Sequence, residues 1–245
     1  MIRPDWPAPD AVQALTTTRQ GGVSTGRWAS LNLADHVGDD PLAVQENRRY
    51  LRKLLDLPAE PVWLQQVHSD NVVEAESVFA GSQIEPPQAD ASVVRVPGLA
   101  SVVMTADCLP ALFCDRAGSC VAAAHAGWRG LAAGVLESTV QTMGVDPGEL
   151  LVWLGPAIGP QAFEVGDEVR FAFVEQHPHA AVAFTPGPRQ RWLADLYELA
   201  RIRLSAVGVQ AVYGGDRCTF TEADLFYSYR RDDVTGRMAS LIWLD

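Results

Sequence analysis

Leu109–Gly130, LPALFCDRAGSCVAAAHAGWRG, contains two apolar runs joined by a polar turn and followed by a second, glycine-spaced turn. Asp115–Gly118 (DRAG) is typical of a hairpin, so Leu109–Cys114 and Ser119–Ala124 are predicted to be neighbouring strands. The following run, Leu131–Met143, is rich in Ala, Leu and Val and stops at Gly144, which predicts a helix with a glycine end. Two paired strands followed by a helix indicate a sheet covered by helices.

The rest of the chain extends this pattern of strands and helices. Asp40-Pro41 predicts the start of a helix that ends near Asp56–Pro58, because Asp is a good cap and Pro suits the first helical position. Further helices are predicted at Asp167–Gln176 and Leu193–Val207. The remaining predicted strands are Ala11–Thr18, Val62–Gln66, Val72–Glu76, Ala91–Val96, Ala100–Thr105, Leu150–Leu154, Val209–Tyr213, Leu225–Tyr229 and Met238–Trp243.

Strands outnumber helices and come in consecutive runs, which favours an α+β fold with a mixed β-sheet flanked by helices. The longest predicted loop is Gly81–Gln88 (GSQIEPPQ), and neither a repeat nor a linker divides the chain. We therefore expect one domain over residues 1–245.

Composition excludes several classes of function. With 48% hydrophobic residues and a net charge of -11, the chain is predicted to be globular and to bind neither nucleic acid nor a membrane. The N-terminal MIRPDWPAPD is unlike a signal peptide, which indicates a cytoplasmic protein with reduced cysteines. Cys114 and Cys120 are interpreted as small apolar fillers of adjacent strands.

Three residues that can bind metal stand at predicted strand ends beside loops, where reactive groups are commonly placed. They are His68, Cys108 and His125. Two imidazoles and one thiolate suit Zn²⁺ and leave a fourth position open for water or substrate. Each also has a structural alternative, as a turn or core residue. Without a metal, Cys108 as nucleophile and His125 as base would make a cysteine hydrolase or transferase.

Other candidates surround these three. Asp70 and Asp107 are expected to orient an imidazole or move a proton. Arg129 and the glycines beside it form an anion-friendly turn at a helix start, whereas Trp128 could stack on a base or fill the core. The further substrate-binding candidates are Asn47, Arg48 and Gln66. Arg48 is equally consistent with a position on a solvated helix face.

Three blocks together resemble a known family. They are Gln65–Val72 (QQVHSDNV), Thr105–Ala111 (TADCLPA) and His125–Leu131 (HAGWRGL). With them the chain is similar to the YfiH-type family, also called the laccase-domain, polyphenol oxidoreductase or peptidoglycan editing factor family. Further similarity lies in Thr18–Ser24 (TRQGGVS), Val37–Pro41 (VGDDP), Glu46–Arg48 (ENR), Leu154–Gly159 (LGPAIG), Phe226–Asp232 (FYSYRRD) and Thr235–Arg237 (TGR).

The resemblance implies a fold related to a cytotoxic necrotizing factor, and a metal held by His68, Cys108 and His125. It implies a small-molecule enzyme, first a zinc-dependent purine nucleoside phosphorylase acting on adenosine, inosine and methylthioadenosine, with adenosine deamination as a side activity. The alternative is an amidase that edits cell-wall precursors, acting on UDP-MurNAc that carries a wrong amino acid. A copper polyphenol oxidase comes third, because one three-ligand site and five histidines are few for a four-electron oxidase.

Overall fold

The computed structural model describes residues 1–80 and 85–245. Its strands are β1 (Val12–Thr16), β2 (Val72–Glu74), β3 (Ala91–Val94), β4 (Ala100–Thr105), β5 (Leu109–Asp115), β6 (Val121–Ala126), β7 (Leu150–Leu154), β8 (Glu164–Val165), β9 (Phe184–Pro186), β10 (Trp192–Ala194), β11 (Ala211–Gly214) and β12 (Met238–Leu244). Its α-helices are α1 (Pro41–Leu54), α2 (Ala75–Ala80), α3 (Trp128–Ala133), α4 (Val135–Met143), α5 (Asp167–Val174), α6 (Leu196–Ala206) and α7 (Tyr229–Asp232).

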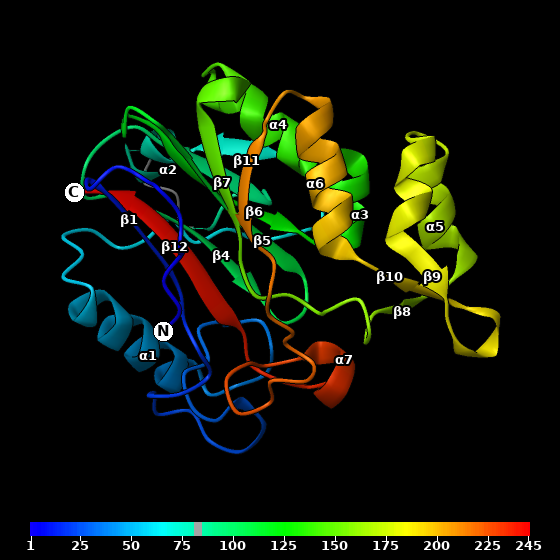
Figure 1. Ribbon diagram of the computed structural model, residues 1–245. Helices are drawn as coiled ribbons and strands as arrows, with labels where there is room; N and C mark the ends of the chain where they lie inside the picture. The colour runs from blue at the N-terminus through cyan, green and yellow to red at the C-terminus, as the bar shows by residue number, and fades with distance from the viewer. Residues whose placement is uncertain (81–84) are drawn as a thin grey trace.

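Two sheets lie face to face, and helices cover both outer faces (Figure 1). The larger has the order β11-β7-β5-β6-β3-β2, with antiparallel pairs in the middle and a parallel pair at each edge. The smaller has the antiparallel order β1-β12-β4. A third, short sheet, β8-β10-β9, lies beside α5. The predicted α+β fold with a mixed sheet and flanking helices is confirmed.

Side chains that alternate along the strands β5 and β6 build two cores. Phe113 and its neighbours on one face pack against α3, α4 and α6. Leu112 and Cys114 point the other way, into the layer between the two sheets. Leu51 of α1 packs on the outer face of the smaller sheet. Since both faces of β5 and β6 are buried, their sequences are almost continuously apolar, as observed.

The hairpin at Asp115–Gly118 is confirmed. Its strands pair in antiparallel register, and Gly118 adopts a positive φ of 67°. The Asp115 carboxylate accepts hydrogen bonds from the backbone N–H groups of Ser119 and Cys120, which holds the turn closed. Both Cys114 and Cys120 are buried and free, in agreement with a packing role. The predicted Gly81–Gln88 loop falls partly on residues 81–84, which lie outside the described residues.

Two predicted strands are wrong. Val62–Gln66 makes only isolated bridges, because the Gln66 side-chain amide, instead of a backbone ladder, bonds the N–H and C=O of Met104. Leu225–Tyr229 is irregular because Ser228 caps the short helix α7, its hydroxyl accepting from the N–H of Arg231.

Several other predicted boundaries are shifted by a few residues, including the strand predicted at Ser119–Ala124, which spans Val121–Ala126. Three more shifts have a clear local cause. The helix placed at Leu131–Met143 begins at Trp128 and is divided by Gly134, whose φ is 109°. The helix placed at Leu193–Val207 begins at Leu196, because Asp195 caps it and the preceding residues pair in β10. The strand placed at Val72–Glu76 ends at Glu74, where α2 begins. Among the described residues, no helix is long and apolar enough to span a membrane.

Candidate metal centre and its cavity

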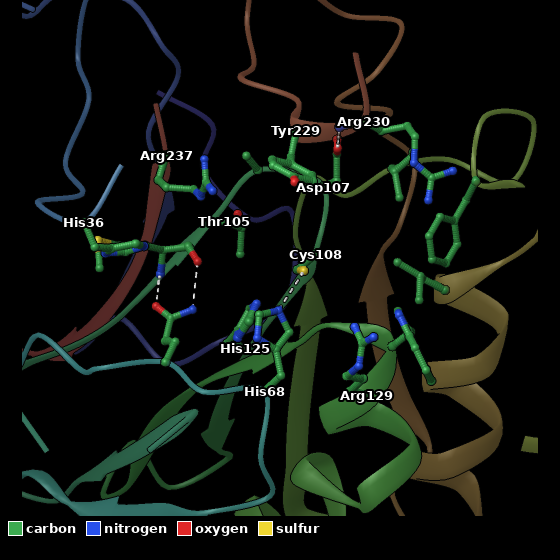
Figure 2. Close-up of a pocket in the computed structure, with 17 residues that line it drawn as sticks. His36, His68, Thr105, Asp107, Cys108, His125, Arg129, Tyr229, Arg230 and Arg237 are labelled. Carbon is green, nitrogen blue, oxygen red and sulfur yellow. Dashed lines mark hydrogen bonds between the residues drawn. The ribbon is translucent and has the colours of Figure 1, made fainter. Parts of the chain in front are cut away.

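His68, Cys108 and His125 come together at one end of the larger sheet (Figure 2). Cys108 stands between β4 and β5, His125 lies near the end of β6, and His68 precedes β2. One ligand atom of each lies within 4.8 Å of the others, and Cys108 Sγ is 3.9 Å from His68 Nε2. His125 is buried, whereas His68 is exposed. The arrangement therefore offers two imidazole nitrogens and a sulfur to a single ion.

Asp90, which immediately precedes β3, holds both histidines in place. Its carboxylate lies 2.8 Å from Nδ1 of His125 and accepts hydrogen bonds from the backbone N–H groups of Val67, His68 and Ser69. The Ser69 hydroxyl donates to it as well. Since Nδ1 of His125 is occupied, its Nε2 is free to bind a metal, as in other metal sites where a carboxylate orients an imidazole.

The glycine-spaced turn after His125 makes room for the His68 loop. A Cβ on Gly127 would lie 2.9 Å from Cys108 Sγ and 2.9 Å from His68 Cδ2. A Cβ on Gly130 would lie 2.9 Å from the carbonyl oxygen of Ser69. Because the following helix, α3, has only six residues, close approach explains these glycines better than anion binding does.

The backbone is strained at two positions beside the cluster. His68 has a φ of 61° and Asp107, next to Cys108, has a φ of 91°. Side chains rarely adopt this left-handed conformation, which persists where surrounding contacts impose it. The bonds of Asp90 to the His68 backbone and of Asp107 to three donors supply those contacts.

The charges of Cys108 and His125 support each other in the metal-free protein. Burial raises the pKa of the Cys108 thiol, but His125 and His68 outweigh this effect and lower the pKa to about 6. Burial lowers the pKa of His125, but Cys108 and Asp90 raise it to about 9. A thiolate is therefore present at neutral pH, which is the form of cysteine that binds metals and reacts as a nucleophile.

A cavity of about 420 Å³ opens above the cluster, a size typical of sites for small molecules (Figure 2). Its walls combine aromatic, apolar and cationic side chains. They include Met104, Trp128, Ile158, Phe163, Leu196 and Tyr229, and the charged or polar residues His36, Gln66, Thr105, Asp107, Arg129, Arg230 and Arg237.

The two candidate aspartates occupy different surroundings. Asp107 lines the cavity, but its carboxylate accepts hydrogen bonds from Thr219 Oγ1, Ser228 Oγ and the N–H of Arg230. These bonds fasten the α7 segment against the Cys108 loop. Asp70 is exposed and is absent from the cavity lining within the described part of the chain. It is Asp90, outside the predicted set, that orients His125.

The predicted substrate-binding residues divide in the same way. Gln66 and Arg129 line the cavity. Asn47 is fully buried and bonds the hydroxyl of Ser24 and backbone oxygens of neighbouring loops, so it holds those loops together. Arg48 is not among the described residues that line the cavity. Its guanidinium stacks 4.0 Å from the centre of the Trp63 ring and contacts the sulfur of Met104.

Several cavity residues carry no local signal that would single them out. Arg230 and Arg237 stand in the FYSYRRD and TGR stretches, which offered only a general similarity. Asp90 had one usable signal, an acid directly ahead of a buried strand. That signal does not identify which acidic residue of the chain will contact His125, which lies 35 positions from Asp90 in the sequence.

We expect Asp90→Asn to destabilise the metal-free protein by about 2 kcal/mol near pH 6. Burial raises the pKa of Asp90, but His125 and Ser69 outweigh it and lower the pKa to about 2. A depressed pKa stabilises the fold above the usual value near 4, and this stabilisation disappears as the pH falls from about 4 to 2. Urea unfolding at several pH values measures the effect.

The matched control is Asp70→Asn, because Asp70 is exposed on the His68 loop, to which Asp90 is hydrogen-bonded. We expect it to change the free energy of unfolding by less than about 0.5 kcal/mol. An equal loss in both variants, or an Asp90→Asn deficit that persists unchanged at pH 2, would contradict the role of the Asp90 carboxylate.

Comparison with known proteins places the chain among close relatives. The family described as "Multi-copper polyphenol oxidoreductase laccase" matches residues 13–245. A Pseudomonas aeruginosa protein named purine nucleoside phosphorylase is 60% identical over 244 residues, covering 99% of this chain and 98% of that protein. An Escherichia coli protein named purine nucleoside phosphorylase YfiH is 54% identical over 244 residues, covering 100% and 98%.

Solved structures show the same fold. A Neisseria meningitidis protein has a TM-score of 0.95 and 55% identity, covering 100% of this chain and 98% of that one. YlmD from Geobacillus stearothermophilus has a TM-score of 0.90 and 34% identity, covering 97% and 93%.

Proposed function

The chain belongs to the family described as multi-copper polyphenol oxidoreductase laccases, and we propose that within this family it is a zinc-dependent purine nucleoside phosphorylase. The proposed substrates are adenosine, inosine and methylthioadenosine, with adenosine deamination as a side activity. The observation that carries the proposal is a His-Cys-His cluster at the base of a cationic, partly aromatic cavity in a chain 54–60% identical to proteins named purine nucleoside phosphorylase. We place the activity in the cytoplasm, where Cys108 stays reduced.

The donor set of the cluster fits zinc. Two imidazoles and a thiolate are typical zinc ligands, and the pKa of Cys108, about 6, supplies the thiolate at neutral pH. His68, Cys108 and His125 would hold the ion. A bound zinc ion would supply Lewis acidity toward an oxygen of the substrates.

The remaining residues bind and orient the substrates. Trp128 and Phe163 offer aromatic surfaces for a purine ring, and Ile158 and Leu196 provide apolar contacts. Three arginines, Arg129, Arg230 and Arg237, make the cavity cationic, which suits a reaction with an anionic co-substrate such as phosphate. We assign Asp107 a positioning role, because its carboxylate oxygens already accept three hydrogen bonds from the protein.

Incubation with adenosine, with and without inorganic phosphate, tests the proposal. We expect adenine and ribose 1-phosphate only when phosphate is present, and a smaller amount of inosine in both cases. The products are separated by chromatography. If neither ribose 1-phosphate nor inosine formed, the result would contradict the proposal and move attention to the cell-wall precursor amidase.

His68→Ala and His179→Ala are the matched variants for this assay. His68 belongs to the cluster, whereas His179 is exposed and lines a different surface groove. We expect His68→Ala to lose phosphorolysis by about 100-fold or more and His179→Ala to keep it. Equal product from both variants would indicate a contaminating phosphorylase.

A further inference from the structure

The cavity has two chemically different ends, with the His-Cys-His cluster between them (Figure 2). At one end lie Arg129, stacked 4.4 Å from the Trp128 ring, and Arg230, 5.3 Å from the Phe163 ring. At the other end lie His36, Thr105 and Arg237. The first end combines two aromatic rings with arginines that stack on them, whereas the second is mainly polar, with Arg237 lying 6.0 Å from the Tyr229 ring. The two ends therefore suit different parts of a substrate pair.

Arg237 is a partly buried cation without a carboxylate partner. Its Nη1 donates to the backbone carbonyls of Thr235 and Gly236, which fixes the guanidinium in place. No ion pair to Arg237 is found among the described residues, and its Nε and Nη2 have no acceptor there. Cys108 and Asp107 act on the guanidinium electrostatically, but no described residue forms a salt bridge with it. Two of its donor groups therefore remain available to an anionic ligand.

Thr105 lies beside Arg237, and its side chain also has an unused hydrogen-bonding group. Across the β4–β12 pair, Thr105 is opposite Met238, the residue after Arg237. Thr105 is 1% exposed, lines the cavity, and its hydroxyl has no hydrogen-bond partner among the described residues. A buried hydroxyl without a partner costs about 1–3 kcal/mol, so a ligand oxygen there would relieve it.

We propose that Arg237 and Thr105 form the subsite for inorganic phosphate and that the purine occupies the opposite, aromatic end. The proposal rests on phosphorolysis as the reaction. The oxygen–C1′ bond forms as the C1′–N9 bond breaks, and the bonding electron pair leaves with the purine. The proton of hydrogen phosphate ends on the departing base. Because phosphate attacks the face of C1′ opposite the base, the two must occupy opposite ends of the cavity.

The arginines at the aromatic end are less suited to phosphate. Arg230 donates to the carbonyl of Glu164, and Arg129 is exposed and stacked on Trp128. Their positions beside Phe163 and Trp128 favour contact with the purine. Arg237 instead presents two free donor groups in a fixed orientation, the geometry in which arginine binds phosphate most strongly.

Calorimetric titration with inorganic phosphate tests the subsite directly, in the metal-loaded protein with and without hypoxanthine, the base released from inosine. We expect Arg237→Gln to raise the dissociation constant for phosphate about 10- to 100-fold. Thr105→Val keeps the side-chain shape and should raise it about 3- to 10-fold. Arg129→Gln, the comparison from the aromatic end, should change it less than about two-fold and raise the KM for adenosine instead.

Thr105→Val also guards against misfolding as the cause. Because its hydroxyl has no partner in residues 1–80 and 85–245, we expect the variant to unfold at the same denaturant concentration as the wild type or higher. Unchanged phosphate affinity in folded Arg237→Gln, or no phosphate binding by the wild type under either condition, would overturn the subsite. Absence of phosphate-dependent products alongside Arg237-dependent phosphate binding would instead contradict phosphorolysis and leave the subsite supported.

Discussion

Replacing Cys108 with alanine is expected to release the bound metal and lower kcat/KM for phosphorolysis of adenosine by about 1,000-fold or more. Cys108 supplies the only sulfur among the three potential ligands, and its thiolate is the anionic member of the set. Two neutral imidazoles alone bind zinc weakly, because the usual catalytic sites have three protein ligands. Elemental analysis of the purified proteins and initial rates with adenosine and phosphate measure both effects.

Cys114→Ala is the matched control. Cys114 is buried in the layer between the sheets, and burial raises its pKa to about 12, so it stays a neutral thiol. We expect this variant to keep its metal and its rate, with a loss of stability of about 1 kcal/mol or less. If Cys108→Ala retained stoichiometric metal and full activity, the metal-site hypothesis would be lost. Metal loss with full activity would restrict the ion to a structural role.

Gly127→Ala is expected to lower both metal affinity and kcat/KM by about 100-fold while leaving the protein folded. The added Cβ would stand 2.9 Å from both Cys108 Sγ and His68 Cδ2, closer than ordinary van der Waals contact. Gly127 has a φ of -61° and a ψ of 155°, which alanine adopts without strain. The expected damage therefore comes from displaced ligands and not from the backbone.

Gly148→Ala provides the comparison for this variant. Gly148 lies in the Pro147–Glu149 turn, and a Cβ there would approach no atom closer than 3.4 Å. We expect Gly148→Ala to match the wild type in metal affinity, rate and melting temperature. Metal affinity is measured by competition with a chromogenic chelator. A Gly127→Ala protein with unaltered metal affinity would show that the turn after His125 can yield, and the close-approach explanation would fail.

Local patterns were informative where neighbouring residues decide the structure. The DRAG hairpin, the Asp40-Pro41 helix start and the Gly144 helix end are confirmed, because each depends on a cap or turn within a few residues. Predictions from local patterns were wrong where a side chain distant in the sequence formed the hydrogen bonds that a neighbouring strand would have formed. The Gln66 side chain takes the place of a strand partner for Met104, and the Asp107 carboxylate bonds Ser228 and Arg230 where an apolar run favoured a strand.

The sequence by itself determined the order of most strands and helices, the mixed character of the sheet and the three residues that form the His-Cys-His cluster. Only the tertiary structure decided that two sheets stack, that Asp90 holds both histidines, and that Arg237 lies beside Thr105. The physical reason is that capping, turn formation and alternation act between residues a few positions apart. Charge pairing, close approach and unpartnered donors instead depend on which distant segments the packed core brings into contact.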